Sequence, residues 1–168
     1  MRWDLSIEFE NVSAVIDCTP HFRERTHPRQ ADFYRGDKHA FFWNAQVIVS
    51  LRGDLFNVQL LMGHNNDQGT FNQTAMGALL ERLGLFWLAD SGYHHHRLVR
   101  PTEDKGILWN NQQKGLRSVV EVTIGMVKNW VFAAETVRVS PELHASLLIA
   151  IYELTQLNLK EFPIRFNV

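Results

Sequence analysis

Leu85-Phe86-Trp87-Leu88-Ala89, followed at once by Asp90-Ser91-Gly92-Tyr93, is the stretch of sequence that decides the fold. A short, wholly apolar run that stops at turn-forming residues is typical of a strand buried on both faces. Such a strand belongs in the middle of a sheet that is packed between helices. The sequence therefore predicts an α/β fold, with the carboxylate of Asp90 at the end of a central strand.

The residues before this run supply three more strands. Asn11–Asp17 is a β-branched run that ends on a carboxylate, and we expect the first strand to stop at Asp17. Residues 18–38 are polar and contain two prolines, which predicts a loop. His39–Ser50 and Leu55–Met62 have strand composition and are separated by a short turn, so they are expected to form a hairpin.

The residues after the hairpin alternate helix, strand and helix. Thr70–Leu83 has helical apolar spacing, and Gly84 is expected to end that helix. Residues 94–115 are read as an irregular connection, and Leu116–Phe132 as a helix in spite of its strand-like composition. Ser140-Pro141-Glu142 predicts the start of a last helix. Its predicted core face consists of Leu143, Leu147, Ile151, Leu154 and Leu157. This order gives a mixed central sheet flanked by helices.

Composition narrows the class of protein. The chain has 168 residues, of which 45% are hydrophobic, and we expect a single domain over residues 1–168. Its apolar runs are shorter than the ~20 residues that span a bilayer, and Met1–Ser6 lacks the layout of a secretory signal. Cys18 is the single cysteine, so a reducing, intracellular location without a membrane partner is expected.

The net charge of −1 argues against an indiscriminate binder of polyanions. The charge is unevenly distributed, however. His21–His39 carries five basic and three acidic residues, and His94–Arg117 carries five basic and two acidic residues. Local basic stretches of this kind can line a phosphate-binding surface. On charge alone, two solvated loops are the simpler interpretation.

Three acids far apart in the sequence are candidates for one site. Asp17 and Asp90 each follow a predicted strand, and Glu121 lies on the predicted helix that must pack across the sheet. Around Glu121, helical spacing brings Arg117 and Lys128 to the same face. Clustered carboxylates repel one another unless a cation lies among them, and hard oxygen ligands suit Mg²⁺ or Mn²⁺. Each aspartate taken singly is more simply a turn or cap residue.

The histidine run His94-His95-His96 gives no comparable signal. Consecutive histidines in a loop cannot all face one ion, and no other zinc-type ligands stand at suitable spacing in the sequence. We therefore expect an exposed loop that at most contacts phosphate.

Several sequence blocks together resemble the nuclease domain of Harbinger/PIF-type DDE transposases. They are Ala14–Thr19, Leu88–Tyr93, Arg117–Glu121 and Ile124–Lys128. Residues Tyr34–His39, Gly63–Asp67, Leu98–Pro101 and Asn110 also fall in the order of that family. The resemblance covers nearly the whole chain. It implies a ribonuclease-H-like fold and a DNA endonuclease that cleaves and rejoins phosphodiester bonds.

The resemblance also implies the roles of particular residues. The catalytic triad falls on Asp17, Asp90 and Glu121, which would hold two Mg²⁺ or Mn²⁺ ions about 4 Å apart. Asp67 matches another acidic position of the family; it is the alternative for the second acid and a candidate metal ligand. The family usually has a histidine before that acid, whereas this chain has Asn66.

Double-stranded DNA is the partner that the resemblance implies. Arg117, Lys128, Arg97 and Lys38 are the expected nucleic-acid contacts. Members of that family usually carry an N-terminal helix-turn-helix region, and this chain has no room for one before Asp17. We therefore expect no N-terminal DNA-binding domain. The further partners that we consider are a separate DNA-binding protein and a second copy of the chain in a homodimer. A nuclear location follows if the source is eukaryotic. The alternative function is a transposon-derived, catalytically idle domain that binds DNA or a protein.

Overall fold

The apolar run forms β5 (Phe86–Leu88), which lies between β1 (Val12–Arg23) and β6 (Leu98–Val99) and runs parallel to both. On its other side β1 pairs antiparallel with β3 (Ala40–Ser50), and β3 pairs antiparallel with β4 (Leu55–Met62). The short β2 (Tyr34–Arg35) also pairs with β3, which completes a six-stranded mixed sheet. The predicted α/β fold with a mixed central sheet is confirmed, and it is consistent with a ribonuclease-H-like architecture.

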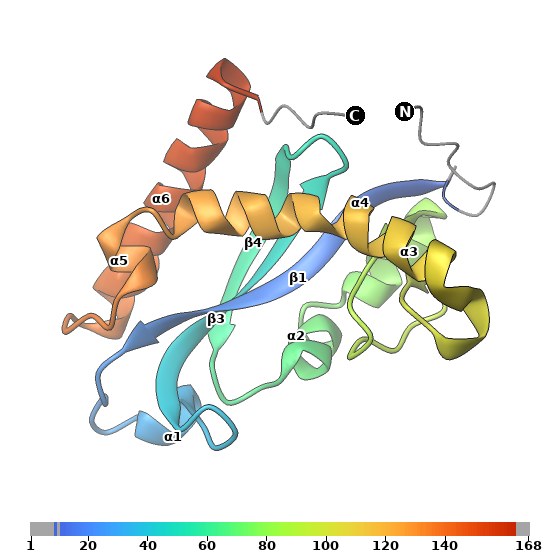
Figure 1. The fold of residues 1–168 in the computed structure, drawn as a ribbon. Coiled ribbons are helices and arrows are strands. Elements are labelled where there is room, and N and C mark those ends of the chain that lie inside the picture. The colour runs from blue at the N-terminus through green and yellow to red at the C-terminus, as the bar shows by residue number, and fades with distance from the viewer. Residues whose placement is uncertain (1–8, 10, 164–168) are drawn as a thin grey trace.

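Helices cover both faces of this sheet (Figure 1). Val15 of β1 belongs to the core shared with α4 (Gly106–Val127), α5 (Val131–Ala134) and α6 (Pro141–Glu161). The next residue, Ile16, belongs to the core under α2 (Asp67–Gln73) and α3 (Met76–Leu83). Because successive side chains of a strand point to opposite faces, these are the two sides of one sheet. Two short elements, α1 (Gln30–Phe33) and the 3-10 helix η2 (Glu103–Lys105), lie in the connections.

The predicted hairpin and the start of the last helix are both confirmed, and each has a local cause. Gly53 adopts φ +93° in the turn between β3 and β4, a conformation that a side chain disfavours. The Ser50 hydroxyl accepts the Asp54 amide and donates to the Asp54 carboxylate, which closes the turn. Ser140 caps α6 by accepting the Leu143 amide at 3.2 Å, with Pro141 as the first helical residue.

The prediction that the first strand ends at Asp17 is wrong. The strand continues to Arg23, with Pro20 opposite Asn44 of β3. Proline lacks an amide donor and is tolerated where a strand has an unpaired side. Within the described residues β5 pairs with β1 only between Val12 and Val15, so the strand around Pro20 has that open side. Asp17 consequently lies in the interior of β1 and not in a turn.

The helices also differ in extent from the prediction. The helix expected over Thr70–Leu83 is two helices, α2 and α3, because Ala75 adopts a left-handed φ of +54° between them. Gly84 does end α3, at φ +64°. The expected irregular connection 94–115 contains β6, and the helix expected from Leu116 begins already at Gly106. It ends at Val127, and α5 follows as a separate turn.

The buried face of α6 differs from the predicted one. The side chains that it buries are His144, Leu148, Ile151, Tyr152, Thr155 and Leu159. Of the predicted stripe, Leu143, Leu154 and Leu157 are exposed. Buried polar residues explain the shift, because the Tyr152 hydroxyl contacts the ring of His21 at 2.8 Å and Thr155 donates to the Ile151 carbonyl at 2.8 Å. An apolar count along the helix cannot identify these polar core positions.

The structure, a computed structural model, describes residue 9 and residues 11–163. Within these residues, none of the helices has the length and apolar character needed to cross a bilayer. Met1–Ser6, whose composition argued against a secretory signal, lies outside the described residues.

Candidate active site

Asp17 and Asp90 lie at the same level of two adjacent parallel strands. Val15 of β1 is in register with Leu88 of β5. Asp17 lies two residues after Val15, and Asp90 lies two residues after Leu88. Parallel strands advance equally per residue, so both acids emerge beside each other, where β5 has ended and β1 continues. Their charges interact, because Asp90 contributes to raising the pKa of Asp17.

Asp17 is the most enclosed of the predicted acids. Its Oδ1 accepts the Cys18 backbone amide at 2.8 Å. Burial raises the pKa of Asp17 to about 6, against the lowering effects of the Cys18 amide and the Arg117 charge, and the charges of Asp67 and Asp90 raise it further. An ionised carboxylate at this position is therefore costly unless a cation compensates it.

Helix α4 brings a row of polar side chains to the same edge. Gln113, Arg117 and Glu121 are spaced four residues apart and so lie along one side of the helix. Gln113 is fully buried, and its Nε2 donates to the carbonyl oxygens of Ala89 at 2.9 Å and Val99 at 3.3 Å. These bonds fix α4 to the ends of β5 and β6, one residue before Asp90.

The guanidinium of Arg117 lies between the acids. Its Nη1 is 3.0 Å from Asp90 Oδ1 and its Nη2 is 3.8 Å from Glu121 Oε1. The Arg117 side chain is 14% exposed, whereas those of Asp90 and Glu121 are 52% and 55% exposed. A fixed cation thus contacts two of the acids and also lowers the pKa of the third, Asp17. The predicted triad is brought to one edge, and its two outer members are accessible to solvent.

Asp67 lies near the same edge but belongs to α2, which covers the sheet face opposite α4. It occupies the first turn of α2, whose N-cap Asn66 accepts the Gly69 amide at 2.7 Å. Asp67 Oδ1 is 3.5 Å from Asn44 Nδ2 and 3.8 Å from Arg35 Nη1. Its charge raises the pKa values of both Asp17 and Cys18. Asn66, which stands where the resemblance led us to expect a histidine, thus acts as the N-cap of α2.

The predicted basic residues fall into separate places. Burial lowers the pKa of Lys128, and the nearby positive charge of Lys38 lowers it further, so these two lysines lie within range of each other. Arg97 is engaged elsewhere, with its Nε 3.4 Å from Glu81 Oε2 and its guanidinium 4.9 Å from the centre of the Phe86 ring. A Cβ added at Gly125, one turn after Glu121, would meet nothing within 4 Å, so the surface there is open.

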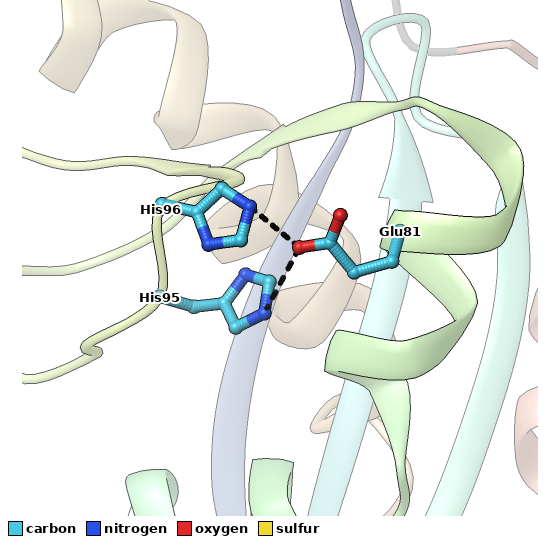
Figure 2. Close-up of side chains that lie close together, drawn as sticks. All are labelled: Glu81, His95 and His96. Carbon is cyan, nitrogen blue, oxygen red and sulfur yellow. Dashed lines mark ion pairs between the residues drawn. The ribbon is translucent and has the colours of Figure 1, made fainter.

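The donor set fits a hard divalent cation. Asp17, Asp67, Asp90 and Glu121 offer carboxylate oxygens, which Mg²⁺ and Mn²⁺ prefer. The elevated pKa of Asp17 and the arginine between Asp90 and Glu121 both indicate a need for positive charge. Across the described residues, the group whose three ligand atoms all lie within 4.8 Å of one another is a different one, which consists of Glu81, His95 and His96 (Figure 2). The acids at the edge are thus more widely spaced than that group.

Sequence reasoning missed two features of this region. Gln113 fell in the stretch read as irregular, although its spacing of four residues from Arg117 was a usable signal once the helix was extended. Glu81 was not connected with the histidine run, because the two lie on different elements and no spacing rule relates them.

One comparison with known proteins gives a match. The family model described as DDE superfamily endonuclease matches residues 16–156, a range that contains Asp17, Asp67, Asp90 and Glu121. No curated protein and no solved structure matches the chain.

Proposed function

The chain belongs to the DDE superfamily endonuclease family, and on that premise we propose that it is a metal-dependent DNA endonuclease and strand-transfer domain whose ions are held by Asp17, Asp90 and Glu121. The observation that carries the proposal is the position of Arg117, which contacts Asp90 and Glu121 and acts electrostatically on Asp17. A protein cation in the middle of three acids marks where a divalent ion would be favourable.

Each side chain has a distinct task in this proposal. Asp17, enclosed in β1, provides the fixed anchor for an ion, and Asp90 and Glu121 provide accessible oxygens on the solvent side. Asp67 is a further acid whose charge acts on the same position. A pair of Mg²⁺ or Mn²⁺ ions, when bound, activates a water or a 3′-hydroxyl for attack on phosphorus and stabilises the leaving oxygen.

The chain's own cations would hold the DNA backbone. Lys38 and Lys128 repel each other, as the lowered pKa of Lys128 indicates, and a phosphate between them would relieve that repulsion. Arg117, which pairs with Asp90 and Glu121 here, would be free to contact a phosphate oxygen if these acids held ions. The open surface at Gly125 leaves space for a backbone to approach Glu121.

Glu121→Gln tests the proposal directly. The change removes one charged ligand and keeps the side-chain shape, so Mg²⁺-dependent cleavage of double-stranded DNA should fall by at least about a hundredfold, with an unchanged circular dichroism spectrum. Glu153→Gln, an exposed position on α6, is the matched control and should cleave like the wild type. Cleavage by Glu121→Gln at the wild-type rate would remove the proposal.

The second candidate is a catalytically idle, transposon-derived domain. Arg117 is compatible with this candidate too, because an arginine that compensates the charges of the acids allows the fold to persist without ions. Ion binding separates the two candidates. At a hundredfold excess over Kd, a bound ion adds about 2.7 kcal/mol to the free energy of unfolding. A melting shift with Mg²⁺ or Mn²⁺ that Glu121→Gln abolishes supports the nuclease, and no shift supports the idle domain.

A further inference from the structure

A second group of ligand-type side chains lies apart from the acids of the sheet edge. Glu81 projects from α3, and His95 and His96 project from the connection between β5 and β6 (Figure 2). Glu81 Oε1 is 2.5 Å from His96 Nε2 and 3.8 Å from His95 Nε2. We propose that these three residues bind a borderline divalent transition-metal ion such as Zn²⁺, independently of the nuclease ions.

The ligand chemistry selects this class of ion. Two imidazole nitrogens and one carboxylate oxygen form a set that suits Zn²⁺, Co²⁺ or Ni²⁺, whereas Mg²⁺ prefers oxygen ligands alone. Three protein ligands leave a fourth tetrahedral position for water. The nuclease carboxylates select the opposite class, so the two sites can be loaded separately.

The surrounding residues hold the ligands in place. The rings of His95 and His96 stack with centroids 4.7 Å apart and 23° between planes, and both present Nε2 to Glu81. The second oxygen of Glu81 is 3.4 Å from Arg97 Nε, an ion pair that keeps this oxygen on the side of the guanidinium. The rings of Phe71 and His95 form an edge-type contact, with centroids 5.5 Å apart and 60° between the planes. Outer contacts of this type are what orient metal ligands in proteins.

A glycine on α3 makes room for the site. A Cβ added at Gly77, one turn before Glu81, would lie 2.9 Å from His95 Nε2. The imidazole therefore packs directly against the helix backbone, at the position from which Glu81 can reach it. The same feature provides a way to disturb the site without removing any ligand.

The histidine run had been expected to lack a further ligand, and the structure corrects this. His94 does turn away, with its Nδ1 2.9 Å from Arg100 Nη1 and its amide donating to Gln68. The other two histidines meet Glu81, which the sequence places on a different element. The expectation that all three histidines cannot face one ion holds, and two of them suffice.

Binding requires a proton to leave Nε2 of each ring, because His96 Nε2, at 2.5 Å from Glu81 Oε1, donates a proton to that carboxylate. The Arg97 amide donates to His95 Nδ1 at 3.2 Å, so the neutral ring carries its proton on Nε2. In each ring the proton would pass from Nε2 to Nδ1, which leaves the Nε2 lone pair for the ion, and in His95 the hydrogen bond from the Arg97 amide would be lost. A bound ion would link α3 to the connection that runs from Asp90 to β6.

Titration of the full chain with Co²⁺ in millimolar Mg²⁺ tests the site, because Mg²⁺ occupies the carboxylates while Co²⁺ reports nitrogen ligands by its visible absorption. One Co²⁺ per chain, displaced by Zn²⁺, is expected. Glu81→Gln and His96→Gln should each weaken binding by about a hundredfold, and Gly77→Ala should weaken it by displacing His95. His94→Gln is the matched control from the same run, and Asp90→Asn controls for the nuclease acids; both should bind Co²⁺ normally.

Nitrogen-15 shifts of the His95 ring provide a readout independent of affinity, since ion binding moves the ring proton from Nε2 to Nδ1. Absence of stoichiometric Co²⁺ or Zn²⁺ binding by the wild type would overturn the proposal and leave an imidazole–carboxylate ion pair only. Unchanged binding by both Glu81→Gln and His96→Gln would overturn it as well. Because these readouts require no DNA cleavage, the result is separate from the fate of the proposed nuclease.

Discussion

Asp17 is an acid in the interior of a strand, and its ionisation opposes folding in the absence of metal. Burial, with the charges of Asp67 and Asp90, raises the pKa of Asp17 to about 6 from its ordinary value of 3.8. The folded protein therefore binds this proton more tightly than the unfolded chain. The stabilisation from the protonated form is complete below pH 4 and is lost as the pH rises from about 4 to about 6.

Asp17→Asn should therefore make the metal-free protein more stable than the wild type at pH 7.5, by on the order of 2 kcal/mol, because the amide cannot ionise. The two proteins should have nearly equal stability at pH 3.5, where the carboxyl is protonated in both the folded and the unfolded state. Urea unfolding in EDTA at both pH values measures the difference. A stability difference that is the same at the two pH values would contradict the assignment of the raised pKa to Asp17.

In the proposed metal site, Arg117 is a cation that divalent ions would have to displace from Asp90 and Glu121. Arg117→Gln removes this competitor, so we expect a melting shift with Mg²⁺ that is larger than that of the wild type. The metal-free variant should lose about 1 kcal/mol or less, because Asp90 and Glu121 are about half exposed and such pairs are weak. Equal Mg²⁺ shifts in the two proteins would mean that the arginine and the ions do not share the acids.

At the scale of elements, one buried amide joins the early part of α4 to the ends of β5 and β6. Gln113→Leu leaves the carbonyl oxygen of Ala89 without its donor, while that of Val99 keeps the Ala89 amide, and the change should lower the free energy of unfolding by about 1–3 kcal/mol. Since Arg117 and Glu121 follow on the same side of the helix, DNA cleavage should fall as well. Asn111→Leu makes the same type of change at an exposed position nearby, and it should alter neither stability by urea unfolding nor cleavage.

The elements that could be predicted from the sequence are those marked by a local run of apolar, strand-forming residues. The run Phe86–Leu88 had the composition of a central strand, and the hairpin had a turn at Gly53 with strand-forming residues on both sides. Both predictions depended on local composition, and both are confirmed. Asp90 was likewise found at the end of its strand, because a strand end is a local feature.

The elements that could not be predicted are those fixed by polar groups in the core. His21 fell in a predicted loop, yet it is fully buried in β1, with Nδ1 2.7 Å from the Ala133 carbonyl oxygen and Nε2 2.8 Å from the Tyr152 hydroxyl. Gln113 has the same character in the early part of α4. A buried polar side chain is compensated by a partner far away in the sequence, and an apolar pattern contains no record of that partner.

At the scale of the whole molecule, a net charge of −1 requires DNA binding to be local. The acids at the sheet edge repel phosphate in the absence of ions, and the cations that we propose to contact DNA are Lys38, Lys128 and Arg117. Each phosphate that is neutralised contributes about −0.9 to the slope of log K against log salt. A binding surface built from these residues alone should therefore give a slope of about −2 to −3, far shallower than that of a broadly basic protein.

Lys128→Ala should reduce the magnitude of that slope by about 0.9, as loss of one phosphate contact predicts. The measurement uses the Glu121→Gln variant without divalent ions, so that DNA is bound and not cut, with affinities determined over a range of NaCl concentrations. Lys160→Ala, near the end of α6, changes the net charge by the same amount away from the acids and should leave the slope unchanged. If Lys160→Ala reduced the slope as much as Lys128→Ala, binding would depend on total charge and not on the surface beside Glu121. Each lysine would then act through the field of the whole molecule, and the repulsion between Lys38 and Lys128 would have no connection with DNA.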